Sequence, residues 1–226
     1  MFFIFLKQNL AHAGKNFGRS LQNILFFLIS CAIFFILSQN QVDQALVANS
    51  QQFLMCNIIW FSLLFSLIFA NGDFLAEDYC DGTIEQMIIF CPNLEVFVLS
   101  KIISSWLIFC LPILSVIPFL MALMGANFGF ILHFTILISL ASFAINFVCA
   151  FCGSLNIAGN QAPLLAILAL PLIIPILLIG CGGSFGGGLE AADNFYFSLK
   201  LLAGICVFLG AALLSATTKI VKIVAE

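Results

Sequence analysis

Residues 71–101 read NGDFLAEDYCDGTIEQMIIFCPNLEVFVLSK, and this stretch decides how the chain must fold. It is flanked on both sides by long apolar runs, and it contains six of the ten acidic residues: Asp73, Glu77, Asp78, Asp81, Glu85 and Glu95. Carboxylates inside the hydrocarbon of a membrane cost several kcal/mol each, so the stretch must lie outside it. We therefore interpret it as a polar island between two membrane spans, where the membrane part meets a soluble partner.

The composition of the chain predicts an integral membrane protein. Of its 226 residues, 63% are hydrophobic and 8% are charged, whereas a soluble domain carries roughly 25% charged residues. So few charges cannot cover a soluble surface. The net charge of -3 and the lack of a basic run also argue against a nucleic-acid partner.

The apolar runs predict an all-α membrane protein with six transmembrane helices. A helix needs about 20 apolar residues to cross a bilayer, and such runs lie at about 21–37, 53–70, 102–124, 128–151, 163–180 and 195–217. Residues 1–20 mix basic and apolar side chains, which predicts an amphipathic segment at the membrane interface. A secretory signal peptide is the rival interpretation of residues 1–20. Because the opening is apolar and no clean cleavage motif follows, we expect the segment to stay in the mature protein.

The distribution of Lys and Arg predicts the orientation. Residues 1–20, the polar island and the tail after residue 217 together hold six of the seven basic residues. The loops expected on the other side, at 38–52, 125–127 and 181–194, hold none. Lys200 is the exception, about one turn inside the last span, from where its side chain can snorkel outward. The positive-inside rule therefore places both termini and the polar island in the cytoplasm.

Within the polar island the sequence predicts a short capped helix. Asp81 and Gly82 form a turn signal, and Thr83 with Gln86 fits a capping box whose N-cap is Thr83. Apolar residues then follow on one helical face: Ile84, Met87, Ile88 and Cys91. Pro92 is expected to end the helix. Two interpretations remain open from the residues alone: a connector that hides its apolar face in lipid headgroups, or a coupling helix that meets a soluble partner.

Four prolines fall within two of the predicted spans. Pro112 and Pro118 lie in the third, and Pro171 and Pro175 lie in the fifth. Each removes a backbone donor, so we expect helix kinks at these positions.

The residues that usually carry chemistry give weak signals here. The nine cysteines are scattered through apolar segments, where cysteine behaves as a small hydrophobe. Cys149 and Cys152 form a lone CxxC, and the isolated His12 and His133 are interpreted as packing residues. The chain has no GxxxxGK[ST] motif, and the glycine-rich residues 181–194 lack its lysine. We therefore predict no catalytic residue, no metal site and no firmly bound cofactor.

The segment FLAEDYCDGTIEQMIIFCP resembles the cytoplasmic segment of the CcmB family, the membrane permease of the haem-export ABC system for cytochrome c maturation. That family shows an acidic pair, then Asp-Gly-Ser/Thr-hydrophobic-Glu-Gln-hydrophobic, then a proline. The matching residues are Glu77, Asp78, Asp81, Gly82, Thr83, Ile84, Glu85, Gln86, Met87 and Pro92. The likeness extends over essentially the whole chain through Lys101, Pro112, Pro118, Gly125, Pro171 and Pro175. The chain departs from the pattern at residues 71–72 and 156–161, which are uncharged where other members tend to be basic.

The resemblance implies one ABC-2-like permease domain over residues 1–226, multi-pass in a bacterial inner membrane and not itself an enzyme. ATP would be hydrolysed by a partner resembling CcmA, docked on Glu77, Asp78, Asp81, Gly82, Thr83, Glu85 and Gln86. Two copies of the permease would work alongside CcmC, CcmD and the haem chaperone CcmE. Haem would be a transported or handled ligand.

Two other classes of function are weighed against the permease. One is a passive scaffold that assembles a haem-handling complex without gating anything. The other is a membrane-embedded enzyme, which needs a nucleophile, base or metal cluster within a span, and the sequence shows none. An ion-coupled transporter is disfavoured because most predicted spans lack ionisable residues.

Overall fold

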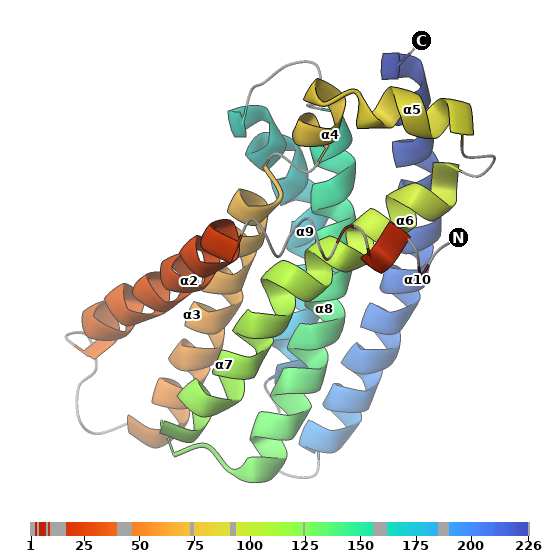
Figure 1. Cartoon of the computed structure of the whole chain (residues 1–226). Coiled ribbons are helices and arrows are strands. Elements are labelled where there is room, and N and C mark those ends of the chain that lie inside the picture. The colour runs from red at the N-terminus through yellow and green to blue at the C-terminus, as the bar shows by residue number, and fades with distance from the viewer. Residues whose placement is uncertain are drawn as a thin grey trace.

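The computed structural model describes residues 3, 5–7, 9, 17–39, 47–72, 75–90, 94–123, 125–155, 162–184 and 190–225. Every regular element within these ranges is helical, as the sequence predicts (Figure 1). The elements are α2 (Phe17–Gln39), α3 (Val47–Ala70), α4 (Ala76–Cys80), α5 (Thr83–Phe90), α6 (Leu94–Ser105), the π-helix η1 (Trp106–Cys110), α7 (Leu111–Leu123), α8 (Phe128–Leu155), α9 (Ala162–Ser184) and α10 (Glu190–Ala225).

Within the described ranges, four helical stretches are long and apolar enough to cross a membrane: Leu94–Leu123, Phe128–Leu155, Ile167–Ser184 and Asn194–Val224. Two shorter apolar helical stretches are Ser20–Ile36 and Leu54–Ala70. The helices run past the predicted apolar segments, most of all at α6, which begins at Leu94, and at α10, which continues to Ala225. A hydropathy window detects only the apolar residues that match the thickness of the hydrocarbon. The helix itself continues into polar residues, because they too can form helical backbone hydrogen bonds.

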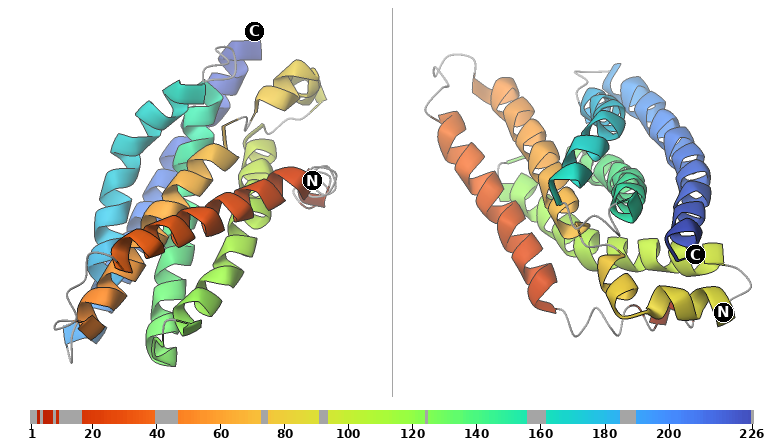
Figure 2. Two further views of the ribbon diagram at one scale, coloured as in Figure 1. Left: turned by 90° about the vertical axis from the view of Figure 1, so that its left-hand side faces the viewer. Right: turned by 90° about the horizontal axis from the view of Figure 1, so that it is seen from above.

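Helix α8 lies at the centre of the bundle. Helices α3, α6, α7, α9 and α10 all contact it, and the view from above shows them arranged around it (Figure 2). Small buried residues along its second half, such as Ala144 and Gly153, let neighbouring helices approach closely. Ser142 and Asn146 lie on the same second half of α8. Ser142 accepts a hydrogen bond from Trp106 of η1, and Asn146 donates one to Ile102 of α6.

Two glycines on α9 allow equally close packing elsewhere. A Cβ atom on Gly180 would lie 2.5 Å from the ring of Trp60 on α3. A Cβ atom on Gly183 would lie 2.4 Å from the Cβ of Ser198 on α10. Contact at this range excludes any larger residue, so these glycines set the spacing of α9 against both neighbours.

Helix α2 lies on the outside of the bundle and crosses α3 obliquely (Figure 2). Polar side chains join the two helices: Ser30 bonds Ser62 at 3.1 Å, and the hydroxyl of Ser66 donates to the side-chain oxygen of Asn23. Bonds of this kind hold helices together in a membrane, where apolar contact alone gives no preference over lipid.

Helices α4 and α5 and the last turns of α10 gather at one end of the bundle, opposite the turn between α7 and α8 (Figure 1). Gly125 makes that opposite turn with a φ of 75°, a conformation that glycine adopts without steric cost. The segment predicted to be a polar island therefore lies at one end of the helices (Figure 1).

Candidate functional site

Helix α5 begins one residue earlier than its sequence predicts. The carbonyl of Gly82 accepts the first helical bond, from the N–H of Gln86 at 3.3 Å, so Gly82 takes the N-cap position. Its φ of 68° turns the chain out of α4, and its own N–H donates to the carbonyl of Tyr79 at 3.1 Å. The prediction of Thr83 as the N-cap was wrong, because only glycine adopts this left-handed turn at no cost.

The two faces of α5 differ sharply. Ile84 is fully buried and Met87 and Ile88 are half-buried, which confirms the predicted apolar face at these three positions. Cys91 and Pro92 lie outside the described residues. Glu85 and Gln86 are exposed on the other side, and Ile89 beside them is 77% exposed.

The buried face of α5 packs on protein. Ile84 belongs to a cluster of buried side chains from α6, α8, α10 and the residue before α4: Leu75, Leu94, Phe97, Val98, Ile102, Phe147, Ala150 and Val221. Burying one aliphatic side chain of this size is worth about 1.5–3 kcal/mol. Helix α5 therefore contacts α6 and α10 and shares a buried cluster with α8, which a connector lying only in lipid headgroups does not require.

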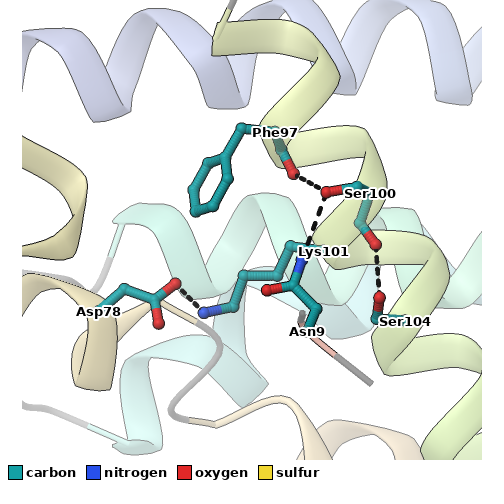
Figure 3. A network of polar contacts seen from close by, with 6 residues as sticks. All are labelled: Asn9, Asp78, Phe97, Ser100, Lys101 and Ser104. Atoms are coloured by element: carbon teal, nitrogen blue, oxygen red, sulfur yellow. Dashed lines mark hydrogen bonds and ion pairs between the residues drawn. The ribbon is translucent and has the colours of Figure 1, made fainter. Parts of the chain in front are cut away.

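The predicted docking residues lie together on α4, the turn and α5, but they do not all face the same way. Asp81, Glu85 and Gln86 are exposed, while Gly82 and Thr83 are half-buried. Asp78 turns inward and forms an ion pair with Lys101 of α6 (Figure 3). The side chain of Glu77 lies outside the described residues.

Residues 97–101 of α6 form a junction for three parts of the chain. The ring of Phe97 meets that of Phe5 edge to face, with centroids 5.9 Å apart. The side-chain amide of Asn9 donates to the hydroxyl of Ser100 at 3.3 Å (Figure 3). Two residues of the predicted interfacial segment 1–20, Phe5 and Asn9, therefore lie against α6. They are close to the ion pair that joins α6 to α4.

A buried polar triad that the sequence analysis missed closes the base of the island. The hydroxyl of Ser105 donates to the side-chain oxygen of Asn71 at 2.8 Å and also lies 3.3 Å from that of Asn146. The Asn146 amide donates to the carbonyl of Ile102 at 2.9 Å. All three side chains are buried. Asn146 is the only amide side chain between residues 128 and 151, and a lone amide in an apolar run was the signal that could have found the triad.

The π-helix η1 follows this triad directly and ends just before Pro112. The N–H of Leu111 bonds the carbonyl of Trp106, five residues back. Pro112 has no N–H, so the carbonyl of Ile108 loses its normal helical donor. The buried hydroxyl of Ser20 on α2 donates to that carbonyl at 3.1 Å instead.

The interruption expected near Pro112 is thus a π-helix on its N-terminal side. Helix α7 continues through Pro118, and α9 continues through Pro171 and Pro175. The kinks expected at those three prolines stay predictions.

Comparison with known proteins identifies the relatives of this chain. A family model described as "CcmB protein" matches residues 1–223. The chain belongs to the CcmB family. The resemblance found through the DGTIEQ core is therefore confirmed.

Two curated relatives in the CcmB family bear the name "Heme exporter protein B". The protein of Pseudomonas aeruginosa is 26% identical over 160 residues, which cover 70% of this chain and 69% of the relative. The protein of Haemophilus influenzae is 24% identical over 225 residues, which cover 96% of this chain and 92% of the relative.

In this CcmB-family chain the described histidine and cysteines are dispersed. His133 is exposed near the start of α8, with its ring centroid 4.4 Å from that of Phe195. The described cysteines are free thiols, and no three His, Cys, Asp or Glu side chains among the described residues gather as metal ligands. The exposed face of the site offers charge and hydrogen-bonding groups at Asp81, Glu85 and Gln86, with the exposed apolar Ile89 beside them.

Proposed function

We propose that this chain is the membrane permease subunit of an ABC transporter complex required for cytochrome c maturation. In this role it couples ATP hydrolysis by a partner ATPase to haem export or to release of a haem-loaded chaperone. The observation that carries the proposal is the family match over residues 1–223, whose relatives are named as haem exporters. The permease itself is non-catalytic, and haem is a ligand that it handles.

The membrane arrangement follows from the helices and the charges. The four long apolar helices and the two shorter ones supply six spans across a bacterial inner membrane. Exposed Lys219 and Lys222 lie at the end of α10, on the same end of the bundle as α4 and α5. The positive-inside rule then places this end in the cytoplasm, together with both termini.

The ATPase docks on the outward face of the island. Asp81, Glu85 and Gln86 offer hydrogen-bond acceptors and donors there. Ile89, one turn further along α5, is exposed and supplies an apolar contact for the ATPase. An apolar side chain rimmed by polar ones is the usual make-up of a protein interface. Because the opposite face of α5 contacts α6 and α10 and Ile84 lies in a buried cluster with residues of these helices and of α8, a force on α5 reaches the spans.

The partners proposed are an ATP-binding subunit resembling CcmA, CcmC, CcmD and the haem chaperone CcmE, with two copies of this permease. The test is purification of the tagged full-length chain from membranes, with identification of its partners and assay of ATP hydrolysis. Replacing Glu85 and Gln86 with Ala is expected to reduce ATPase recovery while the amount of inserted permease is unchanged.

The matched control replaces two exposed polar residues at the opposite end of the bundle, Asn127 and Asn194, with Ala. This pair is expected to leave ATPase recovery unchanged. If the Glu85/Gln86 variant recovers the ATPase at wild-type yield and with normal hydrolysis, the docking face is wrong. If the ATPase is recovered but its hydrolysis rate is the same with and without the permease, the chain is a passive scaffold.

A further inference from the structure

We propose that Asp78 and Lys101 form an internal strut through which the docking segment drives α6, with η1 as the joint about which α6 turns on α7. The proposal rests on the function proposed above, since it needs an ATPase acting on α5. It changes the role of Asp78 from a docking residue to a positioning residue, and it gives Lys101 a role in coupling.

The burial of the pair separates Asp78 from its acidic neighbours. The side chains of Lys101 and Asp78 are 17% and 23% exposed, whereas Asp81 and Glu85 are exposed. Salt weakens an ion pair less when the pair is partly buried than when it is on the surface. The partial burial of Asp78, together with its pairing to Lys101, makes it less accessible to a second protein than Asp81 and Glu85 are.

The strut bridges parts of the chain that lie far apart in sequence. Asp78 lies on α4, before the turn and α5, while Lys101 lies near the middle of α6. Ile84, Val98 and Ile102 belong to one buried cluster and α5 contacts α6, so α4, α5 and α6 are joined both by charge and by apolar contact.

A second tie closes the same unit at its base. The hydroxyl of Ser105 bonds Asn71 at the end of α3, and Ile102 one turn earlier accepts from Asn146 of α8. Residues 75–105 are therefore held at their outer part by the strut and at their base by the triad. Displacement of α5 under these two ties moves α6 as a body.

The joint lies immediately beyond the second tie. The π-helix starts at Trp106, one residue after Ser105, and Pro112 follows its end. A π-helical turn and a proline are the usual places where a helix bends. Rotation of α6 therefore ends at η1, and α7 takes up a new angle below it.

The test compares single charge variants with a charge exchange, in the full-length permease within its complex. Lys101→Met and Asp78→Asn are each expected to keep ATPase recovery and lower cytochrome c maturation about tenfold, within the range of coupling between sites. The exchange of Asp78→Lys with Lys101→Asp is expected to restore maturation. Lys101→Arg keeps the ion pair and is expected to behave like the unmodified chain.

Lys200→Met is the matched control, because it removes one exposed lysine from α10 away from the island. Membrane yield and a single peak in gel filtration identify any variant that fails to fold, and the exchange and Lys101→Arg still decide the proposal in that case. Wild-type maturation by Lys101→Met overturns the strut. Loss of ATPase recovery in Asp78→Asn but not in Lys101→Met also overturns the strut, because Asp78 is then a docking residue. Failure of the exchange to restore maturation overturns it as well.

These outcomes separate the strut from the function on which it rests. If the unmodified permease recovers no ATPase, the proposed function fails before any variant is compared. If it recovers the ATPase and Lys101→Met matures cytochrome c normally, only the strut fails.

Discussion

Two neighbouring apolar stretches of similar length differ in how far they are buried and in whether their helix is continuous. Leu94–Leu123, which contains α6, η1 and α7, has 30 residues, and α8 has 28; both are strongly apolar. Over their most apolar windows, 67% of α8 is buried within the protein but only 22% of Leu94–Leu123. Helix α8 is also unbroken, whereas its neighbour contains a π-helix and two prolines.

This difference in burial is what the proposed strut needs, with α8 as a fixed support and α6 and α7 as the parts that turn. Helix α8 contacts the other helices on several sides, so its displacement disturbs them all. Its polar contacts to the neighbour fall at the interruption: Asn146 meets Ile102 and Ser105 before η1, and Ser142 accepts from the indole of Trp106 within it. Helix α8 thus holds the stretch Leu94–Leu123 close to η1, and α7, which follows η1, is more exposed.

The largest effect is expected from Asn146→Leu, which breaks the contact between the two stretches. The leucine cannot donate to the carbonyl of Ile102, which loses its side-chain donor, while Ser105 keeps its bond to Asn71. Leaving a buried polar group unsatisfied costs about 1–3 kcal/mol. We expect the free energy of unfolding in detergent micelles to fall by about this amount, and cytochrome c maturation to fall with it.

Asn57→Leu on α3 is the matched control for that experiment. Asn57 is half-buried and lies outside the triad, so the same chemical change is expected to leave the unfolding midpoint almost unchanged. Equal losses of stability from the two variants would show that Asn146 has no special place between the stretches.

Pro112→Ala tests the joint itself and is expected to affect function more than stability. The alanine restores a backbone N–H, which can bond the carbonyl of Ile108 and continue the α-helix in place of η1. We expect the unfolding midpoint to hold or rise while cytochrome c maturation falls several-fold. Maturation at the wild-type level would mean that a bend before Pro112 is not needed.

A smaller effect is expected from Ser20→Ala, which removes the hydroxyl that satisfies the carbonyl of Ile108. Hydrogen bonds between helices in a membrane are worth about 0.6 kcal/mol on average, so we expect a destabilisation of that size. The same substitution in the Pro112→Ala background is expected to cost nothing, because the new N–H then occupies the carbonyl. Additive losses in this double-mutant cycle would show that Ser20 does not compensate for the proline.

The sequence foretells the helices and the family better than it foretells these contacts. Apolar length alone locates the long helices, since the bilayer restricts what can cross it. The spacing of Ile84, Met87 and Ile88 locates the buried face of α5. The predicted N-cap of α5 was one residue too late. Gly82 and Thr83 stand side by side, and both a glycine in a left-handed turn and a capping threonine are typical of a helix start.

The inward turn of Asp78 and the partners of Asn71, Ser105 and Asn146 could not be read from the sequence. Each depends on which residues meet across 23 to 44 positions of the chain, and spacing along one helix carries no such information. Pro112 marked an interruption, but the donor that compensates for it comes from α2, 88 residues away.

The smallest effect is expected from His133→Phe, which tests whether the support has any chemistry of its own. His133 lies near the start of α8 with its ring against Phe195, and a phenyl ring can keep that contact. If α8 acts only as a support, cytochrome c maturation and the haem absorbance recovered with the purified complex are both expected to be unchanged. Only two histidines exist in the chain, so His12→Phe is the natural control. Loss of haem absorbance with His133→Phe but not with His12→Phe would make α8 part of a haem site as well as a support.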